Sequence, residues 1–328
     1  MENVIIIGGG PAGLSAAIYL ARADLNPLVF AGSPPGGQLT LTSEVENYPG
    51  FESILGSDLI EKMRNQAKKF GTRIIDENVL KVDFSKKPFI VGNDPRVVPK
   101  TGGHKGSPLQ SKSIIIATGA KALWLNLPSE TRLRGHGVSA CATCDGFFFR
   151  EKTVAVIGGG DTALEEALTL TKFAKKVYII HRRDFFKASK IMQERVLKNE
   201  KIEMIWNSTV EEILGEKRVE GIKIKQIVPL LHGSIDKEKT MKQFNNETII
   251  LEGVFVAIGH KPDTDLFKDK IELDEKGYIK ILERRRTFVR GVFVAGDCAD
   301  PYYRQAVTAA GTGVEAALDV EHYLETNY

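Results

Sequence analysis

The chain contains the same strand–glycine–helix pattern twice, and this repeat limits its fold more than any other feature of the sequence. In the first copy, the β-branched run Val4–Ile7 leads into Gly8-Gly9-Gly10-Pro11-Ala12-Gly13 and then into an Ala- and Leu-rich stretch. In the second copy, Val154–Ile157 leads into Gly158-Gly159-Gly160-Asp161-Thr162-Ala163 and a similar stretch. This order is typical of a βαβ nucleotide-binding unit, so we predict an α/β fold with two Rossmann-like dinucleotide-binding domains.

The positions of later strand-like segments indicate that the second domain is inserted in the first. Ile114–Gly119 follows the first copy of the pattern, Val254–Gly259 follows the second, and Val292–Asp297 comes near the end of the chain. We therefore expect a discontinuous domain and an inserted domain. Their expected bounds are residues 1–119 with 252–328 and residues 123–248.

Composition excludes several classes of protein. The 328 residues are 42% hydrophobic and 27% charged with a net charge of +3, which is typical of a globular enzyme and too weakly basic to indicate a nucleic acid or an anionic membrane as partner. No apolar run approaches the roughly 18 residues of a membrane span. Met1-Glu2-Asn3 runs directly into a strand, so we expect no signal peptide and a cytoplasmic location. The polar stretches Val91–Ser113 and Leu231–Asn246 are expected to be loops or hairpins.

The first glycine turn has the features of a pyrophosphate site. A strand that enters Gly8-x-Gly10-x-x-Gly13 allows the backbone to approach phosphate oxygens at the start of the following helix. A structural glycine turn is the alternative. The acid that often binds a ribose hydroxyl about 20 residues further on is missing, because Ala31–Pro35 stands there.

The second turn indicates a particular nucleotide. Its third glycine is replaced by Ala163, and the following strand ends in His181-Arg182-Arg183, at the same distance from the first glycine as Ala31 in the first copy. Guanidinium groups at this point favour a 2′-phosphate, and therefore NADPH over NADH. Lys187 and Lys190 can extend the basic patch. A solvated basic strand end is the alternative.

Cys141-Ala142-Thr143-Cys144-Asp145 lies just before the second turn. Two thiols at this spacing can form a disulfide reversibly. A zinc site would need two more ligands, and the remaining cysteine, Cys298, and six scattered histidines do not suggest them. Asp145 is either a turn or cap residue or a carboxyl group that exchanges protons with the thiols.

The C-terminal segment adds features of a flavin site. Asp297 follows an apolar strand, where it could bind ribityl hydroxyls or cap a helix. Arg304-Gln305-Ala306 opens a helical stretch to about Tyr323, whose N-terminus could face the pyrimidine edge of a flavin. Gly311 and Gly313 in that helix suggest close packing. We expect Cys298 to be a buried free thiol and Arg284-Arg285-Arg286 to be a solvated run, with partner binding as the alternative for the arginines.

Taken together, these motifs resemble the low-molecular-weight flavin-dependent thioredoxin reductases, class II pyridine nucleotide-disulfide oxidoreductases, along nearly the whole chain. The matching landmarks are Gly8–Gly13, Gly36-Gly37-Gln38-Leu39, Glu44-Val45-Glu46-Asn47, Ala117-Thr118-Gly119, Cys141–Asp145, Gly158–Ala163, His181–Arg183, Gly296-Asp297 and Arg304-Gln305-Ala306. The departures are Pro34-Pro35, where members of the family often carry an acid, and the two polar insertions.

The resemblance implies FAD in the discontinuous domain, NADPH in the inserted domain, a homodimer, and thioredoxin as the substrate. It assigns flavin contacts to Gly8, Gly10, Pro11, Ala12, Gly13, Gln38, Leu39, Asn47, Val79, Ala117, Thr118, Gly119, Gly296, Asp297, Arg304, Gln305 and Ala306. It assigns contacts with NADPH to Gly158, Gly160, Asp161, Thr162, Ala163, His181, Arg182, Arg183, Lys187, Ile258 and Gly259. No metal is expected.

The resemblance also implies the catalytic roles. Cys144 faces the flavin, Cys141 attacks the disulfide of the partner, and Asp145 serves as acid and base. The inserted domain is expected to rotate about hinges near residues 119–123 and 248–252, so that the disulfide and NADPH reach the flavin in turn. Three alternatives remain: another dithiol carrier as substrate, a flavin-dependent dithiol oxidase, and a non-catalytic nucleotide sensor with a zinc-bound cysteine pair.

Overall fold

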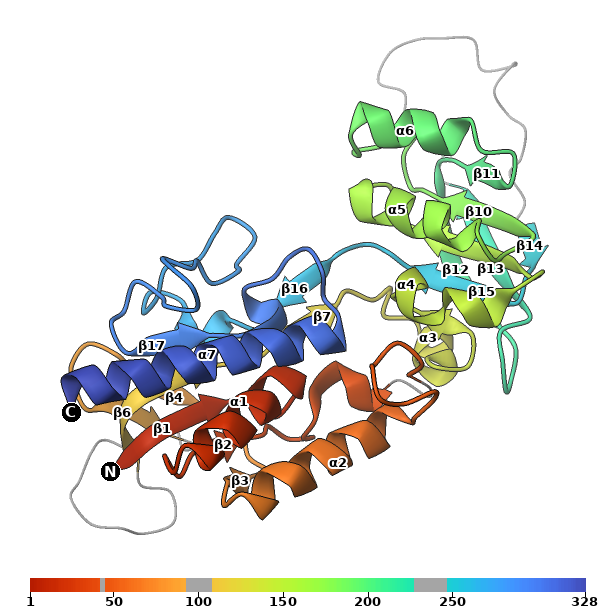
Figure 1. Ribbon diagram of the computed structural model, residues 1–328. Coiled ribbons are helices and arrows are strands. Elements are labelled where there is room, and N and C mark those ends of the chain that lie inside the picture. Colours follow the sequence, from red (N-terminus) through yellow and green to blue (C-terminus); the bar gives the residue numbers. More distant parts are fainter. Residues whose placement is uncertain (42–44, 93–107, 227–246) are drawn as a thin grey trace. The chain divides into compact units, whose positions relative to one another are not determined.

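The computed structural model describes residues 1–41, 45–92, 108–226 and 247–328, which form two compact units (Figure 1). Unit 1 comprises Met1–Lys121 and Lys261–Tyr328, and unit 2 comprises Ala122–His260. Each unit contains a mainly parallel sheet with helices, so the predicted α/β fold with one Rossmann-like domain inserted in another is confirmed.

Unit 1 is built on a seven-stranded sheet with the order β3-β2-β1-β6-β5-β4, in which β17 also pairs with β6. The strands β1, β2, β3, β6 and β17 are parallel, whereas β4 and β5 are antiparallel additions at one edge. The strands are β1 (Glu2–Ile7), β2 (Leu28–Phe30), β3 (Arg73–Ile75), β4 (Lys81–Asp83), β5 (Phe89–Gly92), β6 (Leu109–Ile116) and β17 (Val292–Val294). The helices are α1 (Pro11–Arg22), α2 (Gly56–Lys69) and α7 (Ala306–Asn327), with short 3-10 turns η1 (Gly37–Leu41), η3 (Asp265–Phe267) and η4 (Gly296–Cys298).

The central strand β1 is buried on both faces, as expected for a parallel strand between two layers. Val4 and Ile6 pack in a cluster with apolar residues of α1 and α7, and Ile5 and Ile7 pack in a second cluster that includes Phe89 and Phe267. The predicted α7 helix extends beyond Tyr323 to Asn327. Gly313 gives the expected close packing, because a Cβ there would lie 2.1 Å from the carbonyl oxygen of Ala12, whereas Gly311 faces open space.

Unit 2 is built on a fully parallel five-stranded sheet with the order β11-β10-β9-β15-β8. Its strands are β8 (Val138–Ser139), β9 (Thr153–Ile157), β10 (Lys176–Ile180), β11 (Ile202–Ile205) and β15 (Gly253–Val256). A separate antiparallel sheet contains β12 (Ser208–Leu214), β13 (Gly221–Gln226) and β14 (Glu247–Ile250). The helices are α3 (Pro128–Leu133), α4 (Ala142–Asp145), α5 (Asp161–Leu170) and α6 (Lys190–Leu197), with the 3-10 turn η2 (Gly146–Phe149).

The second boundary lies further along the chain than the sequence suggested. The sequence predicts it at 248–252, but β15 pairs in parallel with β9, with Val254 opposite Ala155, and so belongs to unit 2. The chain crosses between the units after Lys121 and after His260, where β7 (Ala120–Ala122) and β16 (His260–Pro262) pair as a two-stranded sheet. The run that forms β15 follows the second βαβ unit and completes the sheet of that unit. The boundary between the units therefore lies after β15 and not before it.

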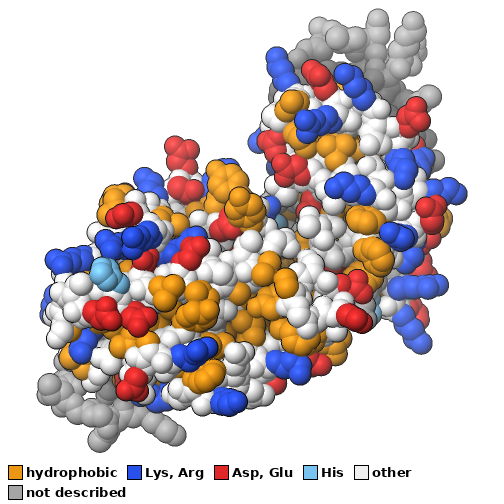
Figure 2. Space-filling view, viewed as in Figure 1, with side chains coloured by type: hydrophobic (Ala, Val, Ile, Leu, Met, Phe, Trp, Pro, Cys, Tyr) orange, Lys and Arg blue, Asp and Glu red, His pale blue; other side chains and the backbone are white. Residues whose placement is uncertain are grey.

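Two other predictions concern regions that are only partly described. The expected loop at Leu231–Asn246 lies outside the described residues, as does most of the one at Val91–Ser113, where β5 and β6 pair in antiparallel fashion on either side. None of the described helices is long and apolar enough to cross a membrane. On the face shown in Figure 2, acidic and basic side chains are intermixed, in keeping with the small net charge.

Candidate active site

The two glycine turns pack in the same way in their separate units. A Cβ on Gly8 would fall 2.0 Å from the carbonyl oxygen of Ala117, at the end of β6, and a Cβ on Gly158 would fall 2.4 Å from that of Ala257, at the end of β15. Both glycines also have positive φ angles, +125° and +153°. The end of the neighbouring strand therefore contacts each turn, which explains why only glycine fits at this position.

The middle glycine of each motif leaves space for a ligand. Nothing in the described protein lies within 4 Å of a Cβ built on Gly160, and the only atom at that limit for Gly10 is the carbonyl oxygen of Gly36. Gly10 is the N-cap of α1 and Gly160 is the N-cap of α5, and as glycines they bring no side chain to cap the helix. The backbone at the start of each helix and the open space beside it fit the pyrophosphate of a dinucleotide in each unit.

A buried carboxyl group lies in the segment of unit 1 that the sequence predicts to contact a flavin. Asp297 lies in η4, and its Oδ1 is buried with no hydrogen-bond partner among the described residues. Burial, assisted by the negative charge of Asp300 and opposed by Arg304, raises the pKa of Asp297 to about 6. The adjacent Gly296 donates its N–H to Oγ1 of Thr312 on α7 at 2.9 Å. An orphaned acceptor held in this way fits a ligand hydroxyl such as those of a ribityl chain.

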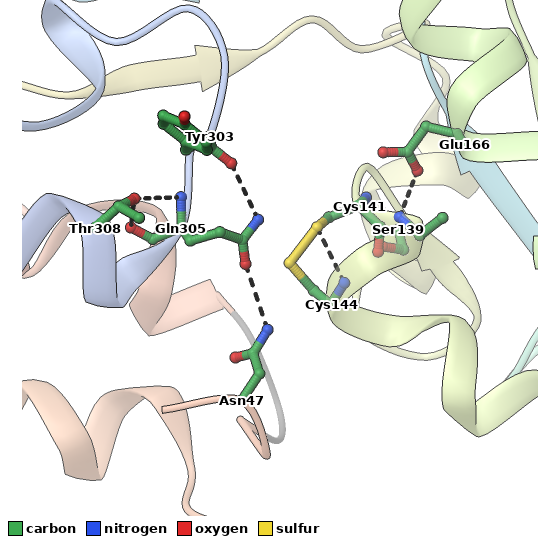
Figure 3. The surroundings of a disulfide bond; sticks show 9 residues. Asn47, Ser139, Cys141, Cys144, Glu166, Tyr303, Gln305 and Thr308 are labelled. Atoms are coloured by element: carbon green, nitrogen blue, oxygen red, sulfur yellow. Dashed lines mark hydrogen bonds between the residues drawn. A yellow bond between two sulfur atoms is a disulfide. The ribbon is translucent and has the colours of Figure 1, made fainter. Parts of the chain in front are cut away.

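Two predicted flavin residues from distant parts of the sequence meet in unit 1. Asn47 donates from Nδ2 to Oε1 of Gln305 at 3.4 Å, and Gln305 donates to the carbonyl oxygen of Tyr303 (Figure 3). Gln305 also forms a capping box with Thr308 at the start of α7. Gln38 and Leu39 lie in η1, and Val79 is partly buried after β3.

The missing ribose acid has no direct replacement at Ala31–Pro35. Instead, the segment is held to the loop after β3: Ser33 donates its N–H to Oδ1 of Asn78 at 3.1 Å, and Gly32 donates to the carbonyl oxygen of Glu77.

His181 occupies a different environment from the two arginines that follow it. Its side chain is only 8% exposed, and a Cβ on Gly159 would lie 2.4 Å from its ring. Phe186 and Trp206 contact the same ring at centroid distances of 6.2 and 6.3 Å. Burial lowers the pKa of His181, and the positive charges of Arg183, Arg182 and Lys187 lower it further. Its Nε2 is buried and has no hydrogen-bond partner among the residues that the structure describes. A neutral imidazole therefore supports the turn.

The arginines lie at the surface of the same loop. Arg182 is exposed, and the Arg183 guanidinium lies 5.6 Å from the ring centre of Phe185. Two contacts fix this loop to the turn: Lys187 donates its N–H to the carbonyl oxygen of Gly159 at 2.8 Å, and Asp161 accepts the N–H and hydroxyl of Ser189, each at 2.8 Å. Ile258 and Gly259 follow β15, beside the Gly158 turn.

Cys141 and Cys144 form a disulfide on the four-residue helix α4 (Figure 3). Cys144 donates its N–H to Sγ of Cys141 at 3.1 Å, and Cys141 donates its own N–H to Oγ of Ser139 at 3.0 Å. Helix α4 packs on α5 through Ala142, which is 1% exposed, and Ala142 donates its N–H to Oε2 of Glu166. The thiol pair is therefore fixed to the helix that begins at the second glycine turn.

Asp145 ends α4 immediately after the pair. Burial raises the pKa of its carboxyl group above the ordinary value, and a hydrogen bond with Ser139 opposes the shift. A carboxyl group that keeps its proton more readily, one residue from Cys144, is suited to exchange protons with a thiol.

The structure adds residues that sequence reasoning did not identify. Ser139 and Glu166 contact the backbone around Cys141, and Thr312 positions Gly296 beside Asp297. Ser139 lies two residues before Cys141, so its closeness in the sequence is a signal for a role beside the cysteine motif. Glu166 and Thr312 lie on other elements, and no local pattern marks them.

The other cysteine has a structural environment. Cys298 is fully buried, its thiol lies 3.3 Å from the carbonyl oxygen of Ala295, and burial raises its pKa to about 11. The expectation of a buried free thiol is confirmed. Among the described residues, no three His, Cys, Asp or Glu side chains gather into a group that could hold a metal. The Arg284–Arg286 run pairs with acids: Arg284 with Asp319, Arg285 with Glu315 and Arg286 with Glu283.

The whole chain is similar to known proteins, and the family model for pyridine nucleotide-disulphide oxidoreductases matches residues 2–313. The chain belongs to this family. It is 51% identical over 327 residues to a thioredoxin reductase of Rickettsia conorii, with 98% of each chain covered. Among solved structures, it is similar to thioredoxin reductases of Giardia duodenalis (41% identity, 98% of each chain covered, TM-score 0.86) and Streptococcus pyogenes (38%, 99% of each, 0.88).

The family predicted from the sequence is confirmed, and membership implies oxidoreductase chemistry with a flavin, a pyridine nucleotide and a disulfide. Among the described residues, the space beside the two glycine turns and the Cys141–Cys144 disulfide fit this chemistry. The oxidoreductase family therefore accounts for the chemistry-bearing features of both units.

Proposed function

We propose that this protein is an NADPH-dependent thioredoxin-disulfide reductase with FAD in unit 1, NADPH in unit 2 and Cys141–Cys144 as the redox-active disulfide. The observation that carries the proposal is the joining of two features in unit 2. The disulfide helix α4 packs on α5, and α5 begins at an open dinucleotide turn. A full-length relative named thioredoxin reductase supports thioredoxin as the substrate.

FAD is proposed for unit 1 because Gly10 is open toward a pyrophosphate and Asp297 presents an orphaned acceptor for a ribityl hydroxyl. When bound, FAD would accept a hydride from NADPH and return the electron pair to a disulfide. Gln305, held by Asn47 at the start of α7, would contact the ring edge at a helix N-terminus, where developing negative charge is stabilised.

NADPH is proposed for unit 2 because the loop that carries Arg182, Arg183 and Lys187 is fixed to the glycine turn by backbone contacts. Guanidinium groups can form charge-assisted hydrogen bonds with a 2′-phosphate. The ring of His181, which packs against Gly159, would hold this glycine in the position that the pyrophosphate requires.

The cysteines and Asp145 would carry out the exchange with thioredoxin. Two electrons and two protons convert the Cys141–Cys144 disulfide into a dithiol. The Cys141 thiolate then attacks one sulfur of the thioredoxin disulfide and forms a mixed disulfide, and Cys144 attacks Cys141 to release the reduced partner. Asp145 would give a proton to the departing thiolate and take one from Cys144, because burial favours its protonated form.

An assay of NADPH oxidation with purified protein, FAD and candidate thioredoxins tests this function. We expect turnover that requires both thioredoxin and Cys141, and a yellow protein that NADPH bleaches without oxygen. Oxygen consumption that a reduced dithiol supports in the absence of NADPH would instead indicate a dithiol oxidase. Bleaching without turnover of any thioredoxin, but with turnover of another disulfide protein, would indicate a different carrier.

A homodimer, a cytoplasmic location and an alternation between two arrangements of the units belong to the same proposal. The crossing points after Lys121 and after His260 are the natural hinges. Covalent cross-links between the units should separate the half-reactions. The form locked with the disulfide at the flavin should take up hydride from NADPH very slowly, and the form locked the other way should reduce its flavin but not its disulfide. A cross-linked enzyme that completes both half-reactions at full rate would contradict the rotation.

A further inference from the structure

Glu166 stands out because its carboxylate reaches from α5 to the backbone of the redox motif on α4 (Figure 3). The acceptor of the Ala142 N–H is Oε2 of this side chain. Ala142 is the first residue of α4, where an N–H has no partner within the helix, and it is 1% exposed, so water cannot replace the carboxylate easily. Without Glu166, a buried donor directly after Cys141 would lose its acceptor.

The same backbone segment determines how Cys141 is presented. Cys141 is the N-cap of α4, and its Sγ accepts the N–H of Cys144 at 3.1 Å. Its own N–H is held by Ser139. Glu166 therefore fixes the next peptide group along the chain, and the position of the Cys141 sulfur depends on contacts at both sides of the residue.

The hydrogen bond to Ala142 also places the carboxyl group of Glu166 next to the backbone of Cys141. A hydrogen bond from an N–H fixes a carboxylate in place, and the bonded Ala142 N–H is one residue from the thiol. The acidic residue of α4 itself is Asp145, and burial favours the neutral form of its carboxyl group. Of the remaining acids on α5, Asp161 accepts from Ser189, and Glu165 is exposed, while the packed turn η2 carries no charged residue.

We infer that Glu166 is a positioning residue that holds the Cys141 backbone in place and disfavours the Cys141 thiolate, so that this nucleophile ionises less readily than it would beside a neutral side chain. The inference rests on the proposed function in that it takes Cys141 as the nucleophile. A carboxylate of this kind limits the reactivity of the dithiol toward small oxidants and alkylating agents, because the thiolate is the reactive species.

The test measures the thiol without any turnover. In a Cys144→Ser background, the N–H of residue 144 remains available to Cys141, and the rate of iodoacetamide alkylation at Cys141 is followed against pH, with mass spectrometry to locate the label. Glu166→Gln keeps an oxygen acceptor for Ala142 but removes the charge. Glu165→Gln, an exposed neighbour on the same helix, is the matched control for loss of one negative charge.

We expect Glu166→Gln to lower the midpoint of the alkylation profile by about half to one pH unit, in keeping with the effect of one nearby charge, and Glu165→Gln to leave it nearly unchanged. Glu166→Ala should lower the midpoint too and should also destabilise the protein. An unchanged or raised midpoint for Glu166→Gln, or an equal shift for Glu165→Gln, would overturn the inference. Thioredoxin turnover by the parent enzyme reports separately on the proposed function, so either can fail alone.

Discussion

The ring of His181 packs so closely against Gly159 that a Cβ on the glycine would lie 2.4 Å from the imidazole. Ala31 occupies the equivalent place in unit 1, where a Cβ on Gly9 would lie 2.5 Å from the Ala31 Cβ. The second glycine of both turns therefore packs against the residue that follows the second strand, which presents a methyl group in one copy and an imidazole ring in the other. Gly159 packs against a side chain whereas Gly160 faces open space, so substitutions at these two glycines should have different effects.

The first prediction contrasts Gly159→Ala with Gly160→Ala. At Gly160 the φ of −96° suits any residue and a Cβ meets no protein atom within 4 Å, so Gly160→Ala should fold normally. Its methyl group would nevertheless occupy the space proposed for the pyrophosphate, so KM for NADPH should rise by at least about tenfold, equivalent to about 1.4 kcal/mol. Gly159→Ala should instead displace His181 and lower the free energy of unfolding by about 1–3 kcal/mol, as overpacking does.

Steady-state kinetics and thermal unfolding of both variants check this contrast. A Gly160→Ala enzyme with an unchanged KM for NADPH would contradict the proposed pyrophosphate position.

The second prediction concerns the choice of nucleotide. Arg182→Ala with Arg183→Ala should reduce the preference for NADPH over NADH by about one to three orders of magnitude, because charge-assisted hydrogen bonds contribute about 1.5–3 kcal/mol each. The loss should appear in KM for NADPH and hardly in NADH kinetics. Arg195→Ala, which removes an exposed arginine from α6 in the same unit, is the matched control and should change neither. Equal losses with both nucleotides would show that the arginines are structural.

The third prediction separates the two half-reactions. Cys141→Ser and Cys144→Ser should each abolish thioredoxin reduction, yet leave FAD bound and reducible by NADPH, because hydride transfer needs only the two nucleotide sites. Anaerobic absorbance spectra and the turnover assay measure both steps. The Cys144 variant should alter the flavin spectrum more, since the resemblance places this sulfur at the flavin. Normal turnover by either variant would remove the disulfide from the mechanism.

Local sequence patterns were sufficient to predict the features that depend on neighbours in the chain. The two glycine turns, the α/β fold and the family followed from short motifs whose spacing reflects backbone geometry. The start of α7 was expected near Arg304 and lies at Ala306, and the close packing expected of its glycines is found at Gly313. Cys298, which was expected to be a buried free thiol, is buried as well.

Features that depend on tertiary contacts were not predictable in this way. The boundary near 252 was misplaced because strand pairing, here of β15 with β9, decides which sheet an apolar run joins. Glu166 reaches Ala142 from another helix, and only folding brings the two together. The burial of His181 is a further case, because the motif His181-Arg182-Arg183 is uniformly polar, whereas the ring of His181 packs against Gly159 and the aromatic rings of Phe186 and Trp206.

The last prediction uses the pH dependence of Asp297. Its pKa is raised from the ordinary 3.8 to about 6, so FAD-free folded protein holds a proton that the unfolded chain releases, and the carboxyl group costs stability as pH rises through this range. Asp297→Asn should therefore stabilise the FAD-free protein at pH 7.5 by up to about 3 kcal/mol, since each pKa unit corresponds to about 1.4 kcal/mol. The gain should shrink as pH falls from 6 to 4. Asp265→Asn is a control of opposite sign, because its Lys261 partner lowers the pKa of Asp265.

Chemical denaturation at several pH values, together with FAD titration, measures both effects. The Asn variant should also bind FAD more weakly, because it replaces a carboxylate acceptor for a ribityl hydroxyl with a neutral amide. A variant that is stabilised equally at pH 4.5 and pH 7.5 would show that ionisation of Asp297 is not the cause. A variant that binds FAD as tightly as the parent would show that the buried carboxylate serves the fold of unit 1 and not the cofactor.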